Sequence, residues 1–413
     1  MKVKFVAFFF ILSIVSVFHP RQLAAADELT VPLTGPVVPP VSDTYEKQAE
    51  SPYSMMAYVQ FWYAYENVEN SKKQEVTGDR AADVSSGFSI NRARIEFETR
   101  LLSFGARLST RFDGGTPGLL DAYGYYRFPF LKLRFIIGQM KIPSTYEVGQ
   151  SDTNLDFATR SKFSDEVVNW SLSKSPSSVS PFTSVQTQSR DTGVAVTAEY
   201  EGLKLFAYAG NGLGANMFAG AEEKKQTMYT NSPEDMFYGM RGDADIIRFL
   251  SIENDLISSL ILGGHISRNK HDNFLYNDTR TVLDMDRFSW SADIRFRLCG
   301  IINFTVMSGG GSINDSLVDS ETSPNVTYKG YEFKLTAEII PGFLRLGYRY
   351  DGYIYKNEIY GGSDELYTQT AGISIWPYMG IKIIADYKWK TTGGNLNPDL
   401  DDNIFILQTQ FVF

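Results

Sequence analysis

Six basic residues recur at alternate positions in three nearby stretches of the chain, and four acidic residues share such rows. The basic residues are Arg92, Arg94, Arg107, Arg111, Lys132 and Arg134, and the acidic ones are Glu96, Glu98, Asp113 and Asp121. Because side chains along a β-strand alternate between two faces, a spacing of two places each row on one face. Guanidinium groups bind carboxylates or phosphates through paired hydrogen bonds. The rows therefore predict either a basic wall that attracts anions or a salt-bridge network that stiffens the wall.

Residues suited to catalysis or metal binding are scarce. The single cysteine, Cys299, cannot form an internal disulfide, and only His265 and His271 follow the first 26 residues. A histidine- or cysteine-rich metal site is not expected, whereas carboxylate ion sites stay open. No G-x-S-x-G motif surrounds His265, so we expect neither an enzyme nor a cofactor.

The elements that would position these rows are β-strands. A period of two between apolar and polar side chains recurs from residue 54 to the end. Asp243 and Asp245 make one of these segments, 235–247, less regular than the others. The pattern predicts sixteen strands, an even number, as in bacterial single-chain barrels. The predicted strands are 54–66, 88–101, 104–113, 119–128, 131–140, 191–201, 203–211, 235–247, 256–266, 286–298, 301–309, 327–340, 342–351, 366–376, 379–390 and 402–413.

Charged rows require one face of these strands to meet water. Segment 286–298, for example, sets Arg295 and Arg297 opposite Ile294 and Phe296. An arginine or lysine that faces lipid at mid-bilayer costs about 2–4 kcal/mol, so several per strand cannot face the membrane. A barrel of about 16 strands is wide enough to enclose an aqueous channel. The predicted fold is all-β, a transmembrane antiparallel β-barrel around a pore.

The connections alternate between short and long, as in barrels whose short turns face the periplasm and whose long loops are extracellular. A soluble β-sandwich has no reason to place a long loop at every second connection. Short turns are predicted at Leu102-Ser103, Pro129-Phe130, Gly202, Gly300, Pro341 and Pro377-Tyr378. Long connections are predicted at 67–87, 141–190, 212–234, 267–285, 310–326, 352–365 and 391–401.

One connection, 141–190, has about 50 residues and is far longer than ordinary loops. It includes Arg160, Lys162, Asp165 and Glu166 among ten charged residues, five of each sign. One interpretation folds the loop into the barrel, where it narrows the channel and sets its selectivity. The other packs it outside, on the barrel mouth. We favour the first interpretation.

The N-terminal region is typical of an exported protein. Residues 1–26 are predicted to be a signal peptide, with an apolar stretch of about 14 residues, too short to span a bilayer, before an alanine-rich cleavage site. Removing its three basic residues takes the formal charge from −9 to −12. Residues 27–52 are predicted to form a proline-rich periplasmic lead-in, and residues 53–413 are predicted to form the barrel.

The final segment, 403–413, alternates between two chemically different faces and ends on an aromatic residue. An open aromatic edge is avoided if this last strand pairs with the first and closes the barrel. Phe411 and Phe413 resemble the C-terminal recognition signal of bacterial outer-membrane proteins. That resemblance implies the barrel assembly machinery as a partner of this strand.

Two motifs resemble the phosphate-selective porin O and P family: F-x-I-x-R-A-R at 88–94 and G-Q-x-K-x-P at 138–143. The resemblance implies a sixteen-stranded outer-membrane porin, commonly a homotrimer, that passes small anions such as phosphate. It also implies that the loop after Pro143 folds into the pore. The chain departs from the family in having no lysine or arginine cluster in 141–190.

The leading hypothesis is an outer-membrane porin for passive diffusion of small hydrophilic solutes, with a preference for anions or phosphate as its finer form. The alternative is a surface adhesin or docking barrel that acts through its extracellular loops, where aromatic residues such as Phe274 and Tyr360 are suited to contact. Outer-membrane lipid is the expected surrounding. No nucleic-acid partner is expected.

Overall fold

The computed structural model describes residues 52–68, 84–112, 117–128, 132–165, 190–212, 236–252, 256–276, 281–314, 316–317, 325–357, 362–394 and 400–413. The expected signal peptide, the lead-in up to Ser51, Asp113 and Glu166 lie outside the described residues. Within the described ranges, no helix is long and apolar enough to cross a membrane.

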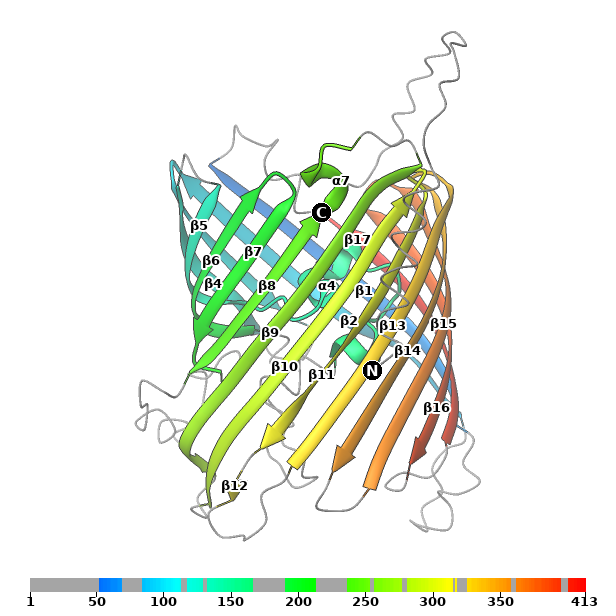
Figure 1. The fold of residues 1–413 in the computed structure, drawn as a ribbon. Coiled ribbons are helices and arrows are strands. Elements are labelled where there is room, and N and C mark those ends of the chain that lie inside the picture. Colours follow the sequence, from blue (N-terminus) through cyan, green and yellow to red (C-terminus); the bar gives the residue numbers. More distant parts are fainter. Residues whose placement is uncertain are drawn as a thin grey trace. The chain divides into compact units, whose positions relative to one another are not determined.

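The strands form one antiparallel sheet that curls into a barrel (Figure 1). They are β1 (Tyr53–Val68), β2 (Val84–Leu101), β3 (Phe104–Arg111), β4 (Gly118–Phe128), β5 (Leu133–Lys141), β6 (Arg190–Tyr200), β7 (Leu203–Gly210), β8 (Phe237–Asp245), β9 (Ile257–Tyr276), β10 (Thr281–Leu298), β11 (Ile302–Asn314), β12 (Ser316–Leu317), β13 (Asn325–Ile340), β14 (Leu344–Asn357), β15 (Gly362–Tyr378), β16 (Ile381–Gly394) and β17 (Leu400–Val412). β12 has only two residues and continues the pairing of β11 with β10. When β11 and β12 are counted as one strand, the barrel has sixteen strands. The predicted sixteen-stranded barrel is confirmed.

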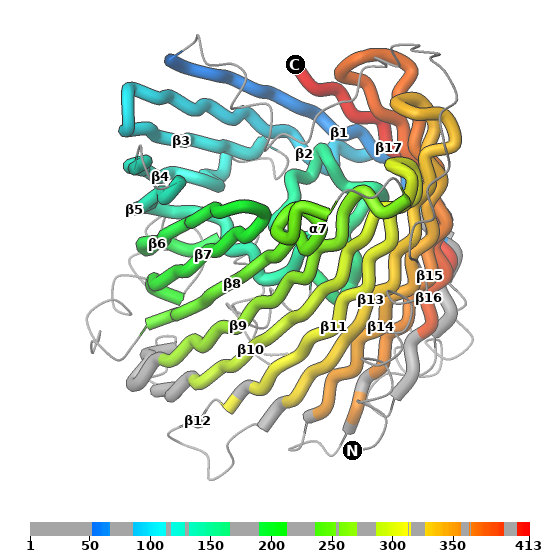
Figure 2. The backbone as a smooth tube through the Cα atoms, turned by 45° about the horizontal axis from the view of Figure 1, so that its top comes forward, coloured from blue at the N-terminus to red at the C-terminus, as the bar shows by residue number. Residues whose placement is uncertain are grey.

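The sheet closes where its last strand meets its first. β1 pairs with β2 on one side and with β17 on the other, with Tyr58 opposite Val412 (Figure 2). The Phe413 N–H donates to the Ala57 carbonyl at 2.8 Å, and the Ala57 N–H donates to the Phe413 carbonyl at 3.2 Å. The aromatic final strand is therefore hydrogen-bonded along both edges, as closure requires.

Alternate side chains separate an apolar exterior from a charged interior. On β16, Asp386 and Lys388 are 0% and 9% exposed. Tyr387 and Trp389, which alternate with them along the strand, are 39% and 42% exposed. In a barrel the exposed apolar row faces outward and the charged row faces the space that the strands enclose. The same division recurs on β14, where Arg349 is 1% exposed and Tyr348 is 38% exposed.

Several long connections predicted from the sequence are wrong, because the strands extend into them. β9 and β10 stay paired as far as Tyr276 opposite Thr281, inside the expected loop 267–285. β14 likewise runs to Asn357, inside the expected loop 352–365. Backbone hydrogen bonds can continue a hairpin beyond the apolar belt, where both faces meet water. The period-two pattern then disappears although the strand does not.

Two predicted boundaries at the short-turn end also differ. β15 continues through Pro377 to Tyr378, and the turn follows at Gly380, whose φ is +81°. Pro377 has no N–H, and it lies where the β15–β16 pairing shifts register, so no ladder hydrogen bond is lost. β8 ends at Asp245, whose side chain accepts from Arg248 N–H and starts α7 (Ile246–Phe249).

The wall is uneven in height. The six consecutive strands β3 to β8 contain 8 to 11 residues each. The remaining strands, with β12 counted as part of β11, contain 13 to 20 residues each.

Candidate functional site

The chain that leaves β5, residues 142–165, lies within the ring of strands, and we call it the inner segment (Figure 1). It contains α4 (Tyr146–Gly149), a 3-10 helix η1 (Asp152–Asn154) and a helical turn at 162–165. Thr145 and Ser151 cap the first two by accepting from the N–H groups of Val148 and Thr153. Such local caps stabilise short helices that have too few hydrogen bonds of their own.

Asp152 fastens the inner segment to β1 and β2. Its carboxylate lies 2.5 Å from Arg94 and 3.5 Å from Arg92, and it also accepts from Arg160 of the inner segment. Its side chain is 1% exposed. Burial by itself would raise the pKa of Asp152, but the guanidinium groups of Arg160, Arg92 and Arg94 hold that pKa well below its ordinary value.

Asp156 holds the inner segment to another part of the wall, formed by β13 and β14. Its carboxylate lies 3.1 Å from Lys334 on β13 and 2.7 Å from Arg345 on β14. Burial acts to raise the pKa of Asp156, and the stronger attraction of Lys334 and Arg345 lowers it. The adjacent backbone is held as well, because Ser374 donates to the Asp156 carbonyl at 3.1 Å and Lys382 donates to the Leu155 carbonyl.

A third attachment surrounds Glu147. Its carboxylate accepts from the Ser161 N–H at 2.6 Å and lies 3.5 Å from Arg349 of β14. Arg349 also donates to the Thr159 carbonyl at 2.9 Å. Further along, the Ala158 N–H donates to Asp386 of β16 at 2.7 Å. The inner segment is thus bound through both side chains and backbone.

Two buried phenylalanines occupy space that glycines leave in the wall. Phe157 is 2% exposed, and a Cβ added at Gly347 would lie 2.9 Å from its Cζ. Phe163 is 0% exposed, and a Cβ added at Gly330 would lie 2.3 Å from its Cδ2. The glycines therefore permit a close approach of the aromatic rings to the wall.

The remaining wall contributes an apolar contact. Ile142 and Val148 of the inner segment pack with Ile136, Tyr208 and Phe237 from β5, β7 and β8. The inner segment therefore contacts strands on several sides of the space that the barrel encloses.

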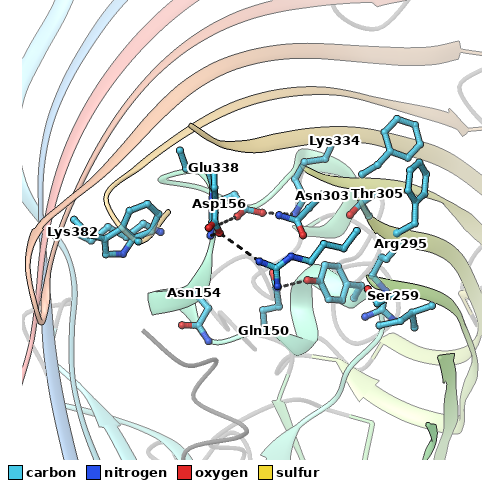
Figure 3. A pocket seen from close by; sticks show the side chains of 18 of the residues that line it. Gln150, Asn154, Asp156, Ser259, Arg295, Asn303, Thr305, Lys334, Glu338 and Lys382 are labelled. Carbon is cyan, nitrogen blue, oxygen red and sulfur yellow. Dashed lines mark hydrogen bonds and ion pairs between the residues drawn. The ribbon is translucent and has the colours of Figure 1, made fainter. Parts of the chain in front are cut away.

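A cavity of about 360 Å³ lies between the inner segment and the short-turn end, next to Gly342 in the turn after β13 (Figure 3). Tyr146, Gln150 and Asn154 of the inner segment line one side of it. In Figure 3, Asp156 and Lys334 point toward each other across its wall. Its lining includes five cationic side chains, Arg295, Arg297, Lys334, Arg345 and Lys382. It includes two carboxylates, Asp156 and Glu338.

The basic residues predicted to form one wall have different surroundings. Arg92 and Arg94 hold Asp152. Arg107 lies 2.6 Å from Glu96 and 3.8 Å from Glu98, as a wall network would require. The Arg134 guanidinium lies 4.7 Å from the ring centre of Tyr125, in a cation–π contact. Arg111 is the last residue of β3, and Lys132 is exposed in the turn before β5.

The other predicted residues are also placed by the structure. Asp121 accepts from Arg190 at 2.8 and 3.1 Å. The side chains of Lys162 and Asp165 are exposed within the inner segment, and the Lys162 N–H donates to Asp351 at 3.0 Å. At the C-terminus, Phe411 meets Phe61 edge to face with ring centres 6.2 Å apart, and Phe413 is 77% exposed.

Sequence reasoning named Arg92, Arg94 and Arg160, which hold Asp152, but it did not single out most of the residues that hold the inner segment or line the cavity. The principal ones are Glu147, Asp152, Asp156, Lys334, Arg345, Arg349 and Lys382. One signal was available, because Gly347 interrupts the inward row between two arginines of β14. A glycine in a pore-lining row marks a place where another part of the chain comes close. Within the described residues, no group of three or more His, Cys, Asp or Glu side chains is placed to hold a metal ion.

No family model matches the chain, and no curated protein matches its sequence. Its fold is that of the outer-membrane porins. The anion-selective porin from Comamonas acidovorans is similar with a TM-score of 0.56 at 11% identity, over 87% of this chain and 99% of that chain. The outer membrane channel DcaP of Acinetobacter baumannii gives 0.55 at 11% identity, over 87% and 97%. OmpT of Vibrio cholerae, in its trimer form, gives 0.54 at 11% identity, over 88% and 100%. At this identity the similarity establishes the fold alone.

Proposed function

We propose that the protein is an outer-membrane porin through which small hydrophilic solutes diffuse passively, with a preference for anions. The observation that carries the proposal is the cavity beside the inner segment, where five cationic side chains meet two carboxylates. Charges that line a narrow, poorly hydrated passage act on a passing ion more strongly than charges elsewhere on the molecule. The excess of cations at the cavity should therefore affect the ion preference of the channel more than the net negative charge of the whole chain does.

The inner segment is the proposed constriction. It is fastened to β1 and β2 by Asp152 and to β13 and β14 by Asp156. A solute must pass between it and the wall. A preference for phosphate over other anions is a finer proposal that the family resemblance supports.

The cellular setting follows from the same proposal. The protein is exported through a cleaved signal peptide, assembled through its C-terminal strand, and placed with its short turns in the periplasm. It forms a homotrimer, as the trimer form of OmpT does. The loops on which an adhesin function would depend lie largely outside the described residues.

Reversal potentials of the purified, folded protein in planar bilayers test the proposal. Under a tenfold gradient of potassium chloride we expect discrete conductance steps and a reversal potential shifted toward the chloride equilibrium value, whose limit is about 59 mV. A folded preparation without conductance steps contradicts the pore. A shift toward the potassium value contradicts the anion preference.

A further inference from the structure

The cations around the cavity differ in how far they are neutralised. Five neighbouring charged groups form a row of alternating sign that begins at Lys334. Asp156 lies 3.1 Å from Lys334 and 2.7 Å from Arg345. Glu338 lies 2.6 Å from Arg345 but 3.9 Å from Arg297. Arg297 therefore ends the row without a carboxylate at hydrogen-bonding distance among the described residues, and its side chain is 44% exposed.

Lys382 makes no ion pair within 4 Å in the described part of the chain, and Asp156 and Asp386 attract its charge only from farther away. Its ammonium group donates to the Leu155 carbonyl and lies 5.1 Å from the ring centre of Trp376. Neither contact removes its charge. The guanidinium of Arg345 lies over the same ring at 5.0 Å, and its buried Nε has no hydrogen-bond partner among the described residues.

Arg295 differs from these residues, because it is already compensated. It pairs with Asp243 and lies 2.7 Å from Asp293, and both carboxylates stand behind the cavity wall. When Arg295 is set aside, the lining itself has four cations and two carboxylates, which is an excess of two positive charges among the residues that face the cavity.

The cavity is large enough for a solute of that charge. Its volume of about 360 Å³ corresponds to about a dozen water molecules at roughly 30 Å³ each. A chloride ion would fill little of it. An excess of two positive charges in the lining of a cavity of this volume matches a small solute that carries two negative charges, because opposite charges in a partly enclosed site attract strongly.

We propose that this cavity is a binding site for a small dianion, with Arg297, Arg345 and Lys382 as its ligands. The inference rests on the proposed porin function. It adds that the anion binds at a defined site during its passage and is not merely attracted by the overall positive potential. Hydrogen phosphate and a short dicarboxylate share the required chemistry, since both present anionic oxygens to guanidinium and ammonium donors. Conduction through such a site saturates.

Inhibition of chloride current by added dianion tests the proposal. Chloride conductance of the full-length protein in planar bilayers is measured while hydrogen phosphate, succinate or acetate is added at constant ionic strength. We expect saturable inhibition by one or both dianions and at least about tenfold weaker inhibition by acetate. Arg297→Gln and Lys382→Gln should each raise the half-inhibiting concentration by about tenfold, since each removes a charge-assisted contact.

Arg268→Gln is the matched control, because Arg268 lies 61% exposed on β9 in a pair with Asp286, away from the cavity. It should leave the half-inhibiting concentration unchanged. Inhibition by hydrogen phosphate alone identifies a site for a compact dianion. Inhibition by both hydrogen phosphate and succinate identifies a site that selects for charge rather than for shape. Conductance that changes linearly with both dianions, or inhibition that persists in both cavity variants, overturns the binding site while leaving the porin in place. Absence of conductance in the wild type overturns the porin instead.

Discussion

Replacing Asp152 with asparagine is expected to release the inner segment from β1 and β2, at a cost of about 3–5 kcal/mol. The carboxylate is 1% exposed and stands among Arg92, Arg94 and Arg160, whose side chains are 16%, 6% and 12% exposed. Without it, three poorly hydrated guanidinium groups face one another uncompensated. Amide hydrogen exchange at 146–154 should accelerate by a factor of about a hundred or more, since each 1.4 kcal/mol is tenfold.

In the proposed porin, the same substitution should also enlarge the single-channel conductance and make it noisier, because the inner segment, its proposed constriction, is no longer held. Asp286→Asn is the control, since it removes a carboxylate from an exposed pair with Arg268 that is worth no more than about 1 kcal/mol. If exchange at 146–154 and the conductance of Asp152→Asn both match the wild type, the attachment through Asp152 is not what holds the segment.

Phe157→Ala is expected to destabilise the folded barrel by about 3–5 kcal/mol, because it empties a site where the ring is 2% exposed. Gly347→Ala should cost about 1–3 kcal/mol, since its new methyl group would lie 2.9 Å from the Phe157 ring. The double variant should be more stable than the sum of the single effects predicts, because the methyl group then enters space that the ring has left.

Urea unfolding of the protein in lipid vesicles measures all three variants. Phe249→Ala on α7 is the control, because that ring is 43% exposed and its loss leaves no internal cavity. Strict additivity of the free-energy changes of Phe157→Ala and Gly347→Ala would show that Gly347 is not needed to make room for the Phe157 ring.

The wall strands were predictable because their environment is chemically two-sided. Alternation identified β10 through Arg295 and Arg297 opposite Ile294, and the closure of β17 on β1 through the aromatic row that ends at Phe413. It failed beyond Ile266 on β9, where both faces are polar and period two carries no information about the backbone.

The site was predictable only in outline. Length alone marked the connection after β5, but which wall residues it meets depends on how the chain crosses the barrel. Asp152 meets Arg94 on β2, and Asp156 meets Lys334 on β13, and neither pair has a local sequence signature. The charged rows indicated that Arg295 and Arg297 face water without indicating that both line one cavity.

The low wall from β3 to β8 has a consequence for the surroundings of the barrel. A strand needs about 9–11 residues to cross a bilayer, and β3 and β7 have 8 each. If the barrel lies in an outer membrane, as proposed, these two strands fall just short of that length, and hydrophobic mismatch is concentrated on their side of the molecule, where lipid chains must shorten or a neighbouring protein must take their place. The shape of the wall gives this side the greater tendency toward association within the membrane plane.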